Sequence, residues 1–168
     1  MKILCISGSA SKTSSNVKFL NAIANHLSAH HTTEVYEGLY NFPLFTPERL
    51  NEGIPEQINL LRDRIINADL IIISTPEYNH NVPAVLKNML EWLTDSGELF
   101  SKKVLPITFT PKAPRGEHAL KSFQMSLKAQ KANIISEANF YKTDVQFVDD
   151  IILLPEDIKL MFDGLLEV

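Results

Sequence analysis

One stretch of the chain decides the fold: residues 69 to 93 read DLIIISTPEYNHNVPAVLKNMLEWL. Its first part, Asp69 to Ser74, is a short apolar run, and such runs are typical of central strands in a parallel sheet. A polar loop follows. From Val82 to Leu93 the apolar residues recur at helical spacing, with Pro83 at the helix start. The stretch therefore predicts a strand, a loop and a helix in that order.

The same order repeats on both sides of this stretch. Nearer the N-terminus, the apolar run Lys2 to Ser7 ends at Gly8, and a helix is expected from Asn16 to Leu27. Residues 40–47 are expected to form a loop. Further strands are expected at residues 34–36, 103–109 and 133–136, and further helices at residues 55–66, 116–131 and 155–168. The alternation predicts an α/β protein, a flavodoxin-like three-layer sandwich with a five-stranded parallel sheet and helices on both faces, as a single domain over residues 1–168.

Composition excludes several classes of protein. The net charge of -4 disfavours non-specific binding to nucleic acid. Cys5 is the only cysteine, so no intramolecular disulfide can form, and its place in an apolar run predicts a buried thiol. The longest strongly apolar stretch, Ala68 to Ile73, is far shorter than a membrane span. We therefore expect a cytoplasmic protein without nucleic-acid or membrane partners, and the spacing of its histidines and carboxylates predicts no metal site.

Three loops should carry the function, because ligands of open α/β sheets bind outside the carboxyl ends of the strands. They are the first loop (Gly8 to Asn16), the second loop (Thr75 to Asn81) and the third loop (Thr110 to Gly116). The first loop is almost entirely small or hydroxyl-bearing, which suits phosphate binding at a helix N-terminus. It is neither a Walker loop nor a dinucleotide fingerprint. The alternative is a solvated loop in which a serine caps the helix.

The second loop combines a proline, an aromatic ring and several amides at the end of the clearest strand. Pro76 and Tyr78 could form an apolar wall for a planar heterocycle, with polar groups at its edge. The alternative is a simple turn before a helix, which explains Pro83 but leaves Tyr78 unexplained in a polar loop.

These residues together resemble a known family. The resemblance rests on Gly8-Ser9 with Ser14 and Asn16, on Pro76-Glu77-Tyr78-Asn79 with Val82-Pro83, and on Leu86-Lys87-Asn88 with Glu91-Trp92-Leu93. The chain is similar to the NADPH-dependent FMN reductase family, which includes flavin, quinone, azo-dye and chromate reductases. The resemblance implies an FMN-dependent oxidoreductase that takes electrons from NADPH or NADH. Its acceptor would be a small molecule such as a quinone, free flavin, an azo compound or a metal oxyanion.

The resemblance also implies which residues bind the cofactor. Those of the first loop would surround the FMN phosphate, and those of the second would line the isoalloxazine ring and the ribityl chain. The expected FMN-binding residues are Ser9, Ser11, Ser14, Ser15, Asn16, Pro76, Glu77, Tyr78, Asn79 and His80. No side chain is assigned a catalytic role, because the flavin itself carries the chemistry.

Two features depart from the family pattern. The family often has an arginine where this chain has Ser11, and the adjacent Lys12 could compensate as a point charge. The third loop is commonly glycine-rich in the family, whereas here it contains two prolines and one glycine. Its Lys112 and Arg115 either meet the flavin or a nicotinamide phosphate, or belong to a solvated basic loop.

The resemblance further implies a homodimer or a homotetramer, with the helix after Pro83 at the subunit contact. Trp92 on that helix is either an oligomer contact or part of the core. Two other functions stay open at this point. One is a flavodoxin-type electron carrier, for which a stable semiquinone would argue; the other is a flavin-free binding domain on the same fold, for which a colourless protein would argue.

Overall fold

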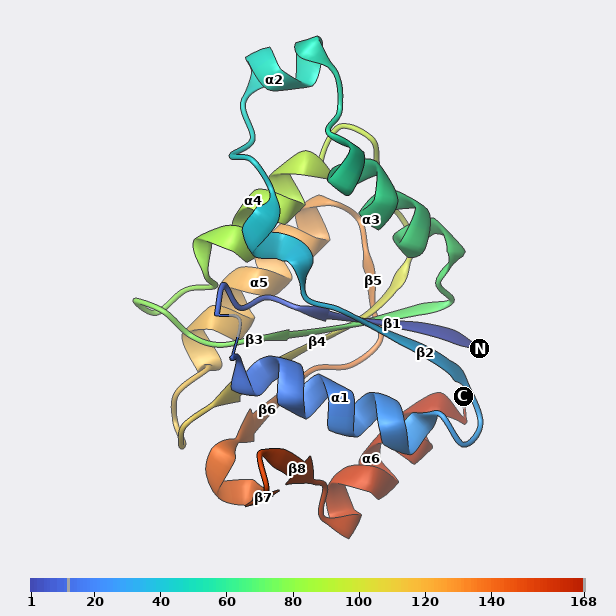
Figure 1. Ribbon diagram of the computed structural model, residues 1–168, viewed down its shortest axis with the longest axis vertical. Helices are drawn as coiled ribbons and strands as arrows, with labels where there is room; N and C mark the ends of the chain where they lie inside the picture. Colours follow the sequence, from blue (N-terminus) through green and yellow to red (C-terminus); the bar gives the residue numbers. More distant parts are fainter. Residues whose placement is uncertain (12, 168) are drawn as a thin grey trace.

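A parallel sheet forms the centre of the molecule (Figure 1). The computed structural model describes residues 1–11 and 13–167. The strands in spatial order are β2 (Thr32–Tyr36), β1 (Lys2–Ser7), β3 (Leu70–Thr75), β4 (Lys103–Thr110) and β5 (Asn133–Ile134). All neighbouring pairs in this order are parallel. The predicted five-stranded parallel sheet is therefore confirmed.

The fifth position of the sheet is shared by two short strands. After β5 the chain leaves the sheet and returns as β6 (Ala138–Tyr141), which pairs with the later residues of β4. The prediction of one strand at 133–136 was therefore wrong in its extent. The interruption falls beside Leu105 and Pro106 of β4, and Pro106 has no backbone N–H to offer a neighbouring strand.

Helices cover both faces of the sheet (Figure 1). On one face α1 (Ser15–Leu27) and α6 (Glu156–Leu166) pack against strand residues such as Ile3 and Cys5. On the other face the core contains residues of β1 such as Leu4 and Ile6. The helices on that side are α3 (Glu56–Asn67), α4 (Ala84–Trp92) and α5 (Glu117–Ala129). Alternate residues of the strands thus point into the two cores on opposite faces of the sheet, and the predicted three-layer arrangement is confirmed.

The segment between β2 and α3 contains helical turns where the sequence predicted a loop. A 3-10 turn, η1 (Gly38–Asn41), comes first, and α2 (Pro47–Glu52) begins at the end of the predicted loop. The N–H of Arg49 donates to Thr46 Oγ1 (3.2 Å), so Thr46 caps α2. No residue of α2 is buried, and the helix stands away from the body (Figure 1). Its pattern has no apolar face, which is why periodicity missed it.

A hairpin precedes α6 and was also missed. It follows a second 3-10 turn, η2 (Lys142–Asp144), and pairs β7 (Gln146–Val148) with β8 (Ile151–Leu153) in antiparallel fashion. Asp149 and Asp150 form its turn with φ of 46° and 70°. The strands are three residues long, too short for alternation to be recognised in the sequence.

Two side chains settle questions raised by the sequence. Cys5 is fully buried, and burial raises the pKa of its thiol to about 12, so the buried-thiol prediction is confirmed. Trp92 is 1% exposed, and its Nε1–H donates to the carbonyl of Pro43 (2.8 Å). Trp92 is therefore a core residue. Within the described chain, no helix is both long and apolar enough to cross a membrane.

Candidate functional site

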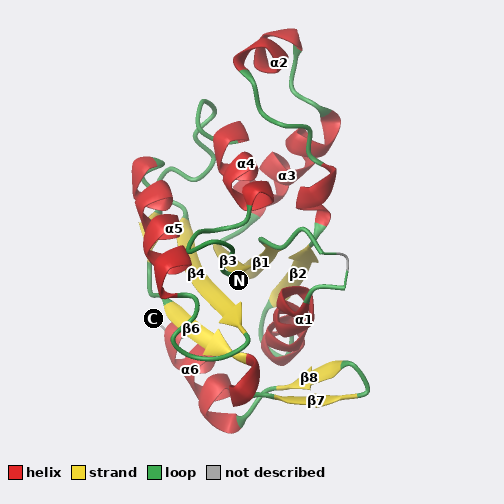
Figure 2. Ribbon diagram, turned by 90° about the vertical axis from the view of Figure 1, so that its left-hand side faces the viewer, coloured by secondary structure: helices red, strands yellow, loops and turns green. Residues whose placement is uncertain are grey.

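The three loops enclose a cavity of about 350 Å³ beyond the carboxyl ends of β1, β3 and β4. In Figure 2, β4 and β6 run toward the viewer beside α1, so this edge of the sheet faces out of the picture. Most of the predicted FMN-binding residues line the cavity, but Asn79 and His80 do not. The lining residues are Ser9, Ser11, Thr13, Ser14, Ser15, Asn16, Pro76, Glu77, Tyr78, Phe109, Thr110, Pro111, Arg115 and Lys142.

The first loop is shaped by hydroxyl groups that accept hydrogen bonds from its own backbone. The N–H of Ser11 donates to Ser9 Oγ (3.2 Å), and the N–H of Thr13 donates to Ser11 Oγ (3.3 Å). The N–H of Asn16 donates to Ser14 Oγ (3.1 Å), which makes Ser14 the N-cap of α1. An accepting hydroxyl keeps its own proton, so Ser9 and Ser14 can still donate to a ligand. Lys12 lies outside the described residues.

Gly8 is required where the first loop begins. Its N–H donates to the carbonyl of Ser74 (2.8 Å), which holds the loop against β3. A Cβ atom at this position would come within 2.8 Å of Leu86 Cδ2 and 3.2 Å of the Thr75 side chain. A side chain here would therefore push the second loop and α4 away from the first loop.

Asn16 ties the start of α1 to the sheet. Its Nδ2 donates to the carbonyl of Phe109 (3.2 Å), and its Oδ1 accepts from Ser74 Oγ (2.7 Å). The residue is buried, and both ends of its amide are occupied by β3 and β4. Asn16 thus positions the N-terminal end of α1 over the sheet, and its side chain is committed to these contacts.

The second loop ends in a tight two-residue turn. The backbones of Tyr78 and Asn81 exchange hydrogen bonds of 2.9 and 3.0 Å, and Asn79 and His80 form the tip with φ of 50° and 57°. This is the mirror-image turn that favours asparagine at positive φ. Tyr78 is 51% exposed and lines the cavity, whereas Asn79 and His80 at the tip do not line it.

Glu77 joins the second loop to the third. Its Oε2 accepts from the N–H groups of Gly116 (3.1 Å) and Ala119 (3.0 Å) at the N-terminus of α5, and His80 Nδ1 lies 3.5 Å from Oε1. Burial raises the pKa of this carboxyl, but those two N–H groups, with His80 and His118, outweigh burial and hold the pKa below its usual range. Its carboxylate therefore serves as an anionic cap of α5.

The third loop is held at both ends. Thr110 Oγ1 donates to the carbonyl of Arg115 (2.8 Å), and Gly116 has φ of 109°, in the region that favours glycine. Arg115 lines the cavity, whereas Lys112 does not. The sequence did not predict that Lys142 lines the cavity. Lys142 follows β6, and β6 reaches the edge of the cavity only because the chain leaves the sheet after β5 and then returns to pair with β4.

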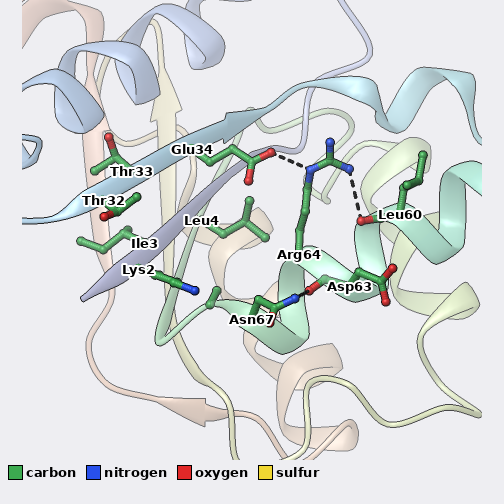
Figure 3. A pocket seen from close by; sticks show the side chains of 11 residues that line it. Lys2, Ile3, Leu4, Thr32, Thr33, Glu34, Leu60, Asp63, Arg64 and Asn67 are labelled. Carbon is green, nitrogen blue, oxygen red and sulfur yellow. Dashed lines mark hydrogen bonds and ion pairs between the residues drawn. The ribbon is translucent and has the colours of Figure 1, made fainter.

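A larger hollow of about 640 Å³ lies at the opposite end of β1 (Figure 3). Two of its charged side chains form a pair: Arg64 Nε lies 2.6 Å from Glu34 Oε1, and Arg64 Nη1 also donates to the carbonyl of Leu60 (3.2 Å). It contains Lys2 at the amino end of β1, the end at which open α/β sheets do not bind their ligands. The smaller cavity remains the candidate site.

Comparisons with known proteins agree with this geometry. The sequence model of the NADPH-dependent FMN reductase family matches residues 1–145. The NADH:(hydroxy)cinnamate reductase subunit CrdA of Vibrio ruber is 37% identical over 103 residues, which cover 61% of this chain and 50% of that protein. The quinone reductase of Escherichia coli K12 is 30% identical over 95 residues, covering 56% of this chain and 50% of that protein. The chain thus spans about half the length of these curated relatives.

Among solved structures, FerB, a flavoenzyme NAD(P)H:(acceptor) oxidoreductase from Paracoccus denitrificans, superposes with a TM-score of 0.79. The superposition covers 99% of this chain and 95% of FerB at 18% sequence identity, which supports the fold. The family match itself takes in every strand of the sheet and all three loops around the cavity. The chain therefore belongs to the NADPH-dependent FMN reductase family.

Proposed function

We propose that residues 1–168 act as one FMN-binding domain that transfers electrons from NADPH or NADH to a small acceptor. One observation carries the proposal: a single cavity joins a hydroxyl-rich helix N-terminus to a wall containing Pro76 and Tyr78. The first feature suits a phosphate and the second suits a flat ring system, and FMN contains both.

The hydrogen-bond donors at the first-loop end of the cavity fit the FMN phosphate. Ser9 and Ser14 are buried and retain donor protons, and the first-turn N–H groups of α1 at Ser15 and Val17 have no partner within the helix. The macrodipole adds about half a positive charge at this end. Asn16 fixes the start of α1 to the sheet through its hydrogen bonds with Ser74 and Phe109.

The ring end of the cavity is bounded by the second and third loops. The anionic cap made by Glu77 holds these two loops together, so the wall that contains Tyr78 has a fixed distance from Thr110 and Pro111. Bound FMN would supply the redox chemistry, accepting hydride from a reduced nicotinamide and passing electrons to the acceptor. Tyr78 is half-exposed, so this part of the cavity wall is accessible from solvent to the nicotinamide and to the acceptor.

A quinone is the first acceptor to test, because one of the relatives is a quinone reductase. The decisive measurement is an absorption spectrum of the purified protein with FMN, recorded before and after addition of NADPH or NADH, and again after a benzoquinone. We expect bleaching of the flavin band by the nicotinamide and its recovery with the quinone.

Other results would favour the other functions. A protein that does not bind added FMN would be a flavin-free binding domain. A protein that holds FMN, is not reduced by either nicotinamide, and gives a stable semiquinone on chemical titration would be an electron carrier.

We also propose that the chain forms a homodimer or a homotetramer in the cytoplasm. Since Trp92 is buried, the contact near α4 would use its outer residues, such as Lys87, together with Leu44. Leu44 is 66% exposed and follows Pro43, whose carbonyl accepts from Asn88 Nδ2 (3.0 Å) on α4. The projecting α2 lies in the same segment of chain and adds further surface, since none of its residues is fully buried. The single buried cysteine suits a reducing compartment.

A further inference from the structure

The phosphate end of the cavity needs more positive charge than its described residues provide. A phosphate monoester carries a charge of about −1.5 to −2 at pH 7, and a helix N-terminus offers about +0.5. Every described residue of the first loop that lines the cavity is neutral: Ser9, Ser11, Thr13, Ser14, Ser15 and Asn16. The counter-charge must therefore come from elsewhere in the fold or from Lys12.

Lys142 lines the cavity from the segment that follows β6. It directly follows Tyr141, the last residue of β6, which pairs with Thr110 of β4. The preceding pair, Phe109 and Phe140, packs against Phe19 of α1, with ring centroids 4.2 and 5.1 Å from that of Phe19. In Figure 1 the start of α1 and the end of β6 lie on the same side of the molecule.

The ammonium group of Lys142 is available for a ligand. Within residues 1–11 and 13–167, it makes no ion pair. The nearest carboxylate in sequence, Asp144, accepts from the N–H of Tyr141 (3.2 Å) and from Thr143 Oγ1 (3.1 Å). Among the described residues that line the cavity, the one carboxylate is Glu77, and it accepts hydrogen bonds from the N-terminus of α5.

Arg115 is the other cation among the described residues that line the cavity, and its backbone is tied to the second and third loops. It precedes Gly116, whose N–H donates to Glu77 of the second loop, and its carbonyl accepts from Thr110 Oγ1. Arg115 is thereby placed with the second and third loops, which bound the ring end. Lys142 instead follows β6, whose Phe140 packs against α1.

We propose that Lys142 supplies the counter-charge for the FMN phosphate, in place of the arginine that Ser11 replaces. The proposal rests on the proposed function, since it assumes that FMN occupies this cavity. Under this proposal, Lys142 is a binding residue that favours FMN over a flavin without phosphate. The segment after β6 would then help to determine which flavin the protein binds.

The test compares FMN with riboflavin, which has the same ring and ribityl chain but no phosphate. The purified chain and its Lys142→Gln variant are dialysed to equilibrium against each flavin, and the bound fraction is measured by fluorescence. We expect Lys142→Gln to weaken FMN about tenfold, since charge-assisted contacts are the strong ones, and to leave riboflavin unchanged. Its FMN affinity should also depend less steeply on salt. Lys121→Gln is the matched control, because Lys121 is an exposed lysine on α5 outside the cavity.

Three results would overturn the assignment. The first is an FMN affinity that is the same in Lys142→Gln and the wild type. The second is an equal loss of affinity for FMN and riboflavin, which would place Lys142 beside the ring. Alternatively, Lys12→Gln could lose FMN affinity while Lys142→Gln does not, which would make Lys12 the counter-charge. If the wild type itself binds FMN no better than riboflavin, the phosphate site fails, and with it the proposed function on which Lys142 depends.

Discussion

At the scale of single residues, Tyr78 is the side chain whose role is easiest to isolate. It lines the cavity with about half of its surface exposed, and no side-chain hydrogen bond of its hydroxyl is found within the described chain. Hydride transfer to a flavin needs no proton from it. We therefore expect Tyr78→Phe to retain turnover, and Tyr78→Ala to lower FMN occupancy or acceptor affinity by several-fold through loss of aromatic contact.

The measurement is NADPH oxidation with a quinone at saturating FMN. A large loss of kcat in Tyr78→Phe would show that the hydroxyl takes part in the reaction. Unchanged kinetics in Tyr78→Ala would show that the ring does not face the flavin.

The two buried hydroxyls of the first loop make a second prediction at this scale. Replacing Ser9 and Ser14 together by alanine removes two donors to the phosphate, and each hydrogen bond to a charged group is worth about 1.5–3 kcal/mol. FMN affinity in a fluorescence titration should fall at least tenfold. Ser14 also caps α1, so the unfolding midpoint of the double variant is measured alongside.

Riboflavin serves as the control ligand for this double variant. Equal losses for FMN and riboflavin would mean that the loop has collapsed as a whole. An unaltered FMN affinity would remove the first loop from the phosphate site.

At the scale of elements, Glu77 connects the second loop to α5, and the connection depends on charge. Its pKa is lower in the folded protein than in the unfolded chain, because two N–H groups favour the carboxylate. The unfolded chain therefore binds the proton more readily, so this contribution to stability is fully present above the unfolded pKa. It is lost as the pH falls through the folded pKa.

The matched variant is Glu77→Gln, which keeps an oxygen acceptor but removes the charge. At pH 7 it should be less stable than the wild type by about 1 kcal/mol, and the difference should shrink as the pH falls below the usual range of a glutamate carboxyl. Urea unfolding at a series of pH values measures it. A difference that stays constant with pH would mean that the charge of Glu77 does not hold the two loops together.

Elements also show what could be predicted from the sequence. The strand Leu70–Thr75 is buried along its whole length, so its apolar run was sufficient evidence for it. The hairpin around Asp149 and Asp150 is too short for periodicity, and α2 buries nothing, so neither leaves an apolar pattern. The cavity was predicted through its loops, but Lys142 belongs to it only because β6 returns to the sheet beside β4.

At the scale of the whole molecule, the proposed assembly gives the last prediction. Light scattering at micromolar concentration should report a dimer or a tetramer. Leu44→Glu places a charge in the proposed contact and should shift the mass to that of a monomer. Leu160→Glu is the control, because Leu160 is similarly exposed but lies on α6, on the other face of the sheet. A monomeric wild type would contradict the proposal, as would equal effects of the two variants.

The projecting segment around α2 has a consequence for how this protein can change over time. Its capping hydrogen bond is local, none of its residues is fully buried, and none lines the cavity, although Leu50 packs at the edge of one core. Exchanges of the exposed residues between Thr46 and Gly53 should therefore be tolerated without loss of the fold or of flavin binding, provided that Leu50 is kept. Substitutions in this segment could therefore strengthen or weaken subunit contacts during evolution without altering the cavity.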